Sequence, residues 1–272
     1  MDLKKKLRII FVSLFMNIVM IEVAWANGLA DFKTTLALAE KGDIKAQNRL
    51  GAMYFGGLSV KQDYQKAKEW WKKSADQGDV YGQYFLAGLY DSGLGVKQDY
   101  YEASFWYRKA AMKGLPSAQY ALGSMYENGN GLKKDLALAV QWYERAALQG
   151  DSEAEFALGM MYVNGRGVTQ SDEQAVQWYK KSAAQGHAKA QYNLGVMFAQ
   201  GKGVKQDFAQ SRYWFQKAAI SGNDAALVSL GLIYEYGNGV KKDINQAKEY
   251  YGQACDRGLQ SACDEYRRLN TQ

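Results

Sequence analysis

The chain has 272 residues, 34 basic and 28 acidic side chains and a formal net charge of +6, with one histidine and two cysteines. A single histidine beside two cysteines leaves no complete ligand set for a zinc site, and no G-x-S-x-G motif accompanies His187 to suggest a serine hydrolase. We therefore expect no metal, no cofactor and no catalytic residue, while the modest net charge favours solubility without identifying a partner.

The first 26 residues have the pattern of a secretory signal peptide. Four basic residues within positions 4–8 precede an apolar stretch from Ile9 to Ile21, and an Ala-x-Ala sequence ends at Ala26. This pattern predicts cleavage after Ala26. An uncleaved membrane anchor is the alternative, although the stretch is shorter than the ~20 residues that a span needs. We expect a periplasmic or secreted protein without stable membrane insertion, and export argues against a nucleic acid partner.

Six internal repeats follow. A fixed period of 36 residues indicates stacked structural repeats, and it is marked by glycine at positions 42, 78, 114, 150, 186, 222 and 258. A single helix within residues 29–41 is predicted before the repeats, and a C-terminal cap, residues 259–272, after them. Residues 27–272 are thus expected to form one solenoid, with repeats at about 43–78, 79–114, 115–150, 151–186, 187–222 and 223–258.

Each repeat is predicted to be a helical hairpin. From Ala46, apolar and small residues fall at offsets 0, 4, 7 and 8, and from Ala67 they fall at offsets 0, 3, 4, 7 and 8, which indicates two helices. Glycines such as Gly93 suit the end of the first helix, and aspartates such as Asp99, or Ser171 in the fourth repeat, suit the start of the second. His187 stands at the start of a first helix where other repeats have Asp or Asn, so we expect a surface cap there. No segment alternates with period two, so we expect no strands.

The segments KAQYNLGVMFAQGKGVKQD, residues 189–207, and YWFQKAAISG, residues 213–222, resemble the Sel-one-like repeat, a relative of the tetratricopeptide hairpin. The resemblance covers about Gly42 to Cys263. It implies an all-α, right-handed α/α superhelical solenoid of about six hairpins plus capping helices. It also implies a scaffold that binds another protein and is not an enzyme.

The two cysteines are expected to form a disulfide. Cys255 takes an alanine position of the last second helix, and Cys263 lies on the closing helix, so the two face one another across a short turn. In an exported protein this placement predicts a disulfide. A redox-active thiol pair is the less favoured alternative, because no C-x-x-C motif is present. Cysteine-rich members of the resembled family have the same spacing, so the resemblance also implies the pairing.

A partner is expected on the concave side, which the first helix of each hairpin lines in tetratricopeptide-like arrays. Apolar and aromatic residues at positions that vary between repeats are the candidates, because exposed rings often mark interfaces. These candidates, with two polar residues, are Arg49, Phe55, Tyr81, Phe85, Met160, Val163, Asn193, Val196, Leu232 and Tyr236. We expect the free protein to be a monomer.

The sharpest hypothesis, implied by exported members of the resembled family, is an immunity protein that binds and neutralises a toxin effector in the periplasm. The effector would be a phospholipase or a cell-wall hydrolase. A secreted host-interaction factor and an envelope signalling adaptor are the alternatives. A hydrolase of cell-wall or β-lactam substrates, or a carbohydrate-binding module, is a lesser alternative.

Overall fold

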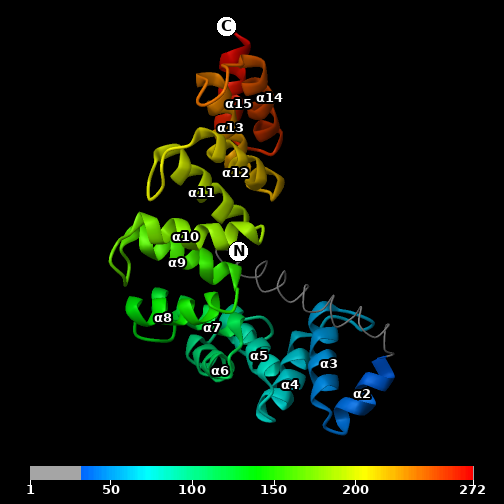
Figure 1. Cartoon of the computed structure of the whole chain (residues 1–272). Coiled ribbons are helices and arrows are strands. Elements are labelled where there is room, and N and C mark those ends of the chain that lie inside the picture. The colour runs from blue at the N-terminus through cyan, green and yellow to red at the C-terminus, as the bar shows by residue number, and fades with distance from the viewer. Residues whose placement is uncertain (1–31, 272) are drawn as a thin grey trace. The chain divides into compact units, whose positions relative to one another are not determined.

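Residues 32–271 of the computed structural model form fourteen α-helices and no strand, which confirms the all-α prediction (Figure 1). The predicted signal peptide, residues 1–26, lies outside the described residues. The helices fall into two compact units, which we call unit 1 and unit 2. Unit 1, residues 32–135, contains α2 (Phe32–Glu40), α3 (Ile44–Gly56), α4 (Tyr64–Asp76), α5 (Val80–Ser92), α6 (Tyr100–Met112) and α7 (Pro116–Asn128). Unit 2, residues 136–271, contains α8 (Leu136–Ala147), α9 (Ser152–Asn164), α10 (Asp172–Ala184), α11 (Ala188–Gln200), α12 (Phe208–Ile220), α13 (Asp224–Tyr236), α14 (Ile244–Asp256) and α15 (Gln260–Asn270).

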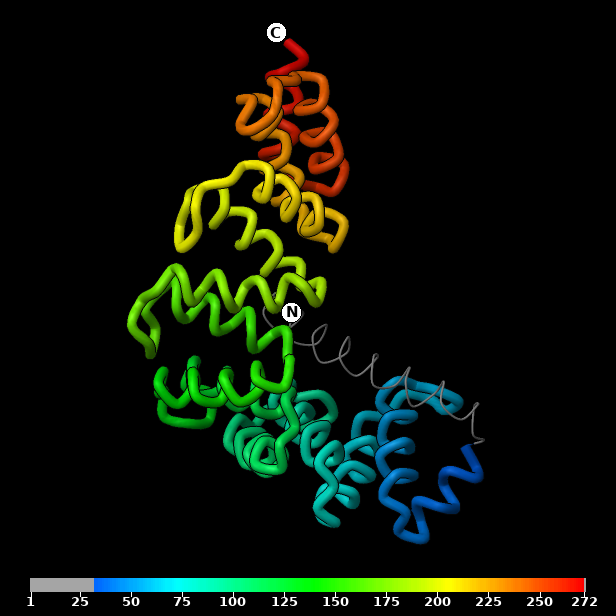
Figure 2. The backbone as a smooth tube through the Cα atoms, viewed as in Figure 1, coloured from blue at the N-terminus to red at the C-terminus, as the bar shows by residue number. Residues whose placement is uncertain are grey.

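Consecutive helices of each unit pair as antiparallel hairpins (Figure 2). In unit 1, α2 is followed by the hairpins α3–α4 and α5–α6 and then by α7. In unit 2, α8 is followed by the hairpins α9–α10, α11–α12 and α13–α14 and then by α15. The order of helices is the one predicted from the repeats. We call α3, α5, α7, α9, α11 and α13 first helices, and α4, α6, α8, α10, α12 and α14 second helices.

The helices begin and end where the sequence signals predict. Asp63 begins α4 by accepting a hydrogen bond from the Lys66 N–H at 3.0 Å, and Ser171 begins α10 by accepting from the Gln174 N–H at 3.2 Å. Each first helix ends at a glycine in the left-handed conformation, for example Gly201 with φ 68°. These caps set the length of every hairpin and keep the repeats in register.

An aromatic ring packed against a glycine lies at the centre of most hairpins. In unit 2 the ring of Tyr179 covers Gly159, where an added Cβ would lie 2.4 Å from the ring. The same contact joins Phe215 to Gly195. Beside these rings the leucine at the repeated position is at most 1% exposed in every repeat: Leu50, Leu86, Leu122, Leu158, Leu194 and Leu230. The repeated rings and leucines therefore form the core.

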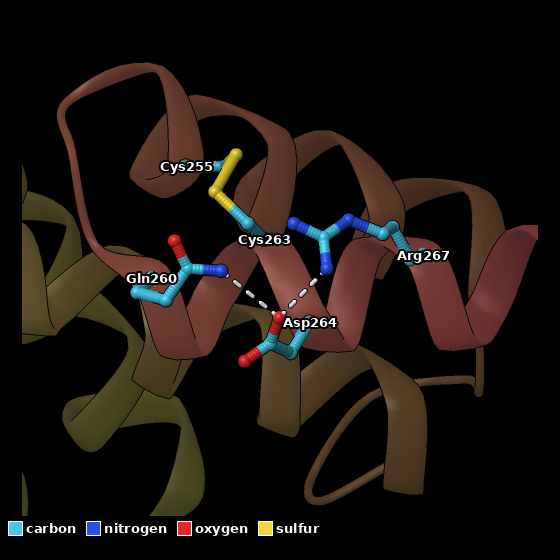
Figure 3. Close-up of a disulfide and its surroundings, with 5 residues drawn as sticks. All are labelled: Cys255, Gln260, Cys263, Asp264 and Arg267. Atoms are coloured by element: carbon cyan, nitrogen blue, oxygen red, sulfur yellow. Dashed lines mark hydrogen bonds and ion pairs between the residues drawn. A yellow bond between two sulfur atoms is a disulfide. The ribbon is translucent and has the colours of Figure 1, made fainter.

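A glutamine ties each of several first helices to the second helix before it. Gln191 Nε2 donates to the Ala183 carbonyl at 3.1 Å. The same hydrogen bond joins the pairs Gln47–Ala39, Gln83–Ala75 and Gln119–Ala111. At the last junction these two positions hold Cys263 and Cys255, and the sulfur atoms form a disulfide (Figure 3). The predicted disulfide is therefore present, and it replaces a hydrogen bond of the repeat with a covalent link.

A buried carboxylate also holds the C-terminal helix α15. Glu235 of α13 is 6% exposed, and its two carboxylate oxygens accept from the Tyr251 hydroxyl at 2.9 Å and from Arg268 Nη2 at 2.6 Å. Burial is the main cause that raises the pKa of Tyr251, and the contact with Glu235 adds to it, so the hydroxyl stays a donor at neutral pH. Three helices of unit 2 thus meet at one carboxylate.

Candidate partner-binding surface

The first helices of unit 2 carry a row of partly exposed apolar side chains. Met160, Val196 and Leu232 occupy the same repeat position on α9, α11 and α13. Met160 and Leu232 are 37% and 41% exposed, Val196 is half-buried, and Tyr236 at the end of α13 is 65% exposed. In unit 1 this repeat position holds only small residues, Ala52, Gly88 and Ser124. We call Met160, Asn193, Val196, Leu232 and Tyr236 the free face of unit 2.

Met160 is held in place by two neighbouring helices. Its Sδ accepts from the Tyr179 hydroxyl at 3.1 Å and from Asn193 Nδ2 at 3.4 Å. Burial raises the pKa of Tyr179 to about 12, so its hydroxyl is protonated at neutral pH and remains a donor. A thioether is a weak acceptor, but two donors fix the side chain between α9, α10 and α11. Part of the free face is therefore ordered before any partner arrives.

The remaining candidates differ in exposure. Tyr81 is 46% exposed on α5, Arg49 is half-buried on α3, and Val163 packs partly against the core of unit 2. Phe55 and Phe85 were expected as exposed rings, and this expectation is wrong because both are buried. Their ring centroids lie 5.5 and 5.0 Å from that of Trp71, which fills the space between them.

The only histidine is a helix cap and also an internal contact. His187 Nδ1 accepts from the Ala190 N–H at 3.1 Å, as predicted for a cap of α11. Its Nε2 lies 3.3 Å from Glu153 Oε1, and its ring stacks on Phe156 with centroids 4.6 Å apart. The side chain is only 10% exposed, so it is not the surface cap that the sequence suggested. Both ring nitrogens make structural contacts.

Two acids lie near the start of α9: Asp151 is its half-buried N-cap, and Glu155 is buried on the helix. Burial raises the pKa of Asp151, whose carboxylate accepts from the Ala154 N–H at 2.9 Å. Burial also raises the pKa of Glu155, while a hydrogen bond from Gln185 Nε2 at 2.8 Å opposes the shift. These acids cap a helix or join two helices. Within residues 32–271 no group of three or more His, Cys, Asp or Glu side chains is arranged to hold a metal ion.

The sequence reasoning considered only the first helices and therefore missed the exposed apolar side chains of the second helices. On α6, Tyr101, Phe105 and Met112 are 71%, 44% and 76% exposed. The signal was present in the repeat, because α4 has acidic residues at the positions of Phe105 and Met112. None of the helices within residues 32–271 combines the length and apolar character that crossing a bilayer requires.

Six consecutive segments of the chain match the Sel1 repeat: residues 44–79, 80–115, 116–151, 152–187, 188–223 and 224–259. The crystal structure of a protective antigen present in uropathogenic Escherichia coli strains, which displays an SLR fold, is 38% identical with a TM-score of 0.84. That match covers 87% of this chain and 51% of the E. coli chain, so the present chain spans about half the length of that protein.

A Sel1 repeat protein from Oxalobacter formigenes is 36% identical with a TM-score of 0.74, and the match covers 84% of this chain and all of the other. An immunity protein from Pseudomonas aeruginosa is 21% identical with a TM-score of 0.48, covering 78% of this chain and 81% of the other. That likeness is too distant to bear on function. No curated protein matches the chain.

Proposed function

The chain belongs to the Sel1 repeat family of protein-interaction scaffolds, and we propose that it binds a partner protein through the free face of unit 2. The observation that carries this proposal is the apolar row of Met160, Val196 and Leu232. The core leucine two residues before this position is the same in every repeat, whereas the position itself is large and apolar in unit 2 only. Exposed apolar side chains at freely varying positions are typical of a binding surface.

The free face has the composition of an interface centre. Tyr236 supplies an exposed ring and Leu232 an aliphatic contact, while Asn193 offers an amide that can bond to a partner. Binding energy at interfaces is concentrated in a few such side chains, and aromatic residues are prominent among them. The ordered Met160 lowers the entropic cost of binding, because its position is set before the partner docks.

Within this function we propose an exported immunity protein as the first candidate. The support is the signal-peptide pattern of residues 1–26 together with what the resemblance to the repeat family implies, since the family has exported members in that role. The partner would be a toxin effector that acts in the periplasm, a phospholipase or a cell-wall hydrolase. The producing cell should then survive that effector only while the free face is intact.

A secreted protein that acts on the host is the second candidate. It is favoured by the likeness to the protective antigen of uropathogenic Escherichia coli, at 38% identity over 87% of this chain. The match covers 51% of that antigen, so this candidate concerns only the role of the shared repeats.

The experiment replaces two exposed residues of the free face, Leu232→Asp and Tyr236→Asp, in one variant. Partners are captured from the envelope fraction of the producing cell, identified by mass spectrometry and then titrated against each purified protein. The expected result is a loss of affinity of about tenfold or more, because each charge faces an apolar contact. A neighbouring gene for a lipase or amidase toxin, and rescue of growth from that toxin, would favour the immunity role.

A matched control is Leu148→Asp in the turn after α8, which places a charge at a side chain of the same unit that is 78% exposed. This control should bind like the wild type. If it loses the partner while the free-face variant keeps it, the partner docks elsewhere and the proposed surface is wrong.

A further inference from the structure

The outer side of α6 in unit 1 carries an apolar ridge made of Tyr101, Phe105 and Met112. The three side chains are 71%, 44% and 76% exposed. Spacings of four and seven residues place them on one face of the helix. At the repeat positions of Phe105 and Met112, α4 has Glu69 and Asp76. All three side chains are exposed, and the Phe105 ring has one edge-on contact with the buried Trp106, with ring centroids 5.1 Å apart.

Basic side chains surround this ridge. Lys109 Nζ lies 4.4 Å from the ring centroid of Phe105 and 4.6 Å from that of Trp106. Lys72 of α4 also lies over the Trp106 ring, 5.4 Å from its centroid, so the outer faces of α4 and α6 are continuous. The exposed basic residues of the two helices are Lys66, Lys72, Lys73, Arg108 and Lys109, and the exposed acidic residues are Glu69 and Asp76. Lys72 pairs with Asp76 at 2.5 Å. The basic residues still outnumber the acidic ones, so the surface around the ridge has a net positive charge.

This combination fits an anionic lipid surface. Aromatic rings such as those of Tyr101 and Phe105 favour the headgroup region of a bilayer. Basic side chains beside them are attracted to anionic headgroups, and their long apolar stems allow the charge to stay at the headgroups while the ring goes deeper. A projecting ridge also needs no complementary hollow, because a lipid surface deforms around it. A basic helix with one apolar face typically lies in the plane of the interface.

We propose that α6, with the adjoining face of α4, is a peripheral docking site for an anionic lipid bilayer. This site is separate from the free face of unit 2 and goes beyond the proposed binding of a protein. Three apolar side chains give weak and reversible attachment. Much of the attraction comes from exposed charges, so the binding weakens as salt is added.

The test uses the full chain and vesicles of two compositions, phosphatidylcholine alone and equal parts of phosphatidylcholine and phosphatidylglycerol. Binding is measured by co-sedimentation at low and high salt. The variant Phe105→Asp with Met112→Asp is compared with Tyr213→Asp and Ile220→Asp on α12, which changes the same repeat positions in unit 2. The proteins share one N-terminus, so any binding through residues 1–31 is common to them all.

The wild type and the α12 variant are expected to bind the phosphatidylglycerol vesicles and to release them at high salt. The affinity of the α6 variant for these vesicles should be lower by about tenfold or more, because the two added negative charges are repelled by the anionic surface. A Phe105→Leu, Met112→Leu variant keeps the apolar ridge and should bind like the wild type. Circular dichroism of each variant shows whether it is folded.

Several outcomes would overturn the proposal. Equal binding by the α6 variant and the wild type would place lipid contact elsewhere, and so would loss of binding in the α12 variant alone. Absence of binding by the wild type would show that the ridge does not dock on lipid, and a protein would then be the expected partner. A dimer of the wild type that the α6 variant does not form, detected by analytical ultracentrifugation, would make the ridge a contact between two copies of the chain.

Discussion

Replacing a loop glycine with alanine tests whether packing between repeats or backbone conformation requires glycine there. Gly203, in the loop between α11 and α12, lies against the first turn of α10. An added Cβ would be 2.3 Å from the backbone of Asp172 and 2.7 Å from the Glu173 nitrogen. Gly222, in the turn between α12 and α13, has φ +89° and no atom within 4 Å of an added Cβ. The two variants Gly203→Ala and Gly222→Ala therefore separate the two causes.

The expected magnitudes follow from these contacts. A left-handed conformation costs an L-residue about 1–2 kcal/mol, and alanine recovers about 0.4–1 kcal/mol by restricting the unfolded chain. Gly222→Ala should therefore lower the free energy of unfolding by at most about 1.6 kcal/mol. Gly203 has φ +64°, so alanine there has the same cost of a left-handed backbone conformation. Its clash is with backbone atoms that cannot rotate away, which adds about 1–3 kcal/mol.

Urea unfolding followed by circular dichroism measures the free energy of unfolding of both variants. The slope of this free energy against urea concentration should equal that of the wild type if the unfolding reaction is unchanged. Because long repeat arrays can lose cooperativity, hydrogen exchange at the first turn of α10 gives a local readout. Gly203→Ala should speed exchange there and Gly222→Ala should not. Equal destabilisation by the two variants, with unchanged exchange in α10, would refute the packing argument.

Two further predictions concern unit 2. Replacing both Cys255 and Cys263 with serine should lower the free energy of unfolding by about 2–3 kcal/mol in the loop-entropy description. The same change should speed hydrogen exchange in α15. Unchanged exchange in residues 260–270 would instead show that Glu235 and Arg268 hold the helix alone. Asp151→Asn should raise stability at neutral pH, because asparagine also caps helices and carries no charge to desolvate. The folded-state pKa of Asp151 is raised above 3.8, so the protonated form is favoured by folding and stability is lost as pH rises through that pKa. The difference between Asp151→Asn and the wild type, measured by urea unfolding across pH, should therefore vanish below about pH 3.8, and a difference that persists in acid would contradict this assignment.

The repeated core could be predicted from the sequence because the same spacing of small and apolar residues recurs in each repeat. The offsets of small and apolar residues fix the helix register, and the ring of Tyr179 over Gly159 shows the outcome at one repeat. The disulfide was predictable for the same reason, since the register alone places Cys255 and Cys263 opposite one another. Local signals, such as the cap at Ser171, were equally sufficient.

The surface was harder to predict because its positions do not follow the repeat. The burial of Phe85 depends on Trp71, the one tryptophan in a position that otherwise holds tyrosine or phenylalanine. His187 was correctly assigned as a cap, but its burial depends on Phe156, a residue of another first helix. Such contacts join side chains far apart in sequence, and a pattern along one chain gives no information on which of them meet.

The covalent link between α14 and α15 has a consequence for how the array comes apart under tension. A pull on the C-terminus first loads Arg268, which Glu235 ties to α13, and then the disulfide, whose eight-residue separation between cysteines cannot be extended. At the preceding junction the glutamine position is occupied by Leu227, which cannot donate to the Ala219 carbonyl; that oxygen instead accepts from Arg257 at 3.5 Å. Rupture should therefore begin one hairpin inward from the end, with α13, α14 and α15 released together.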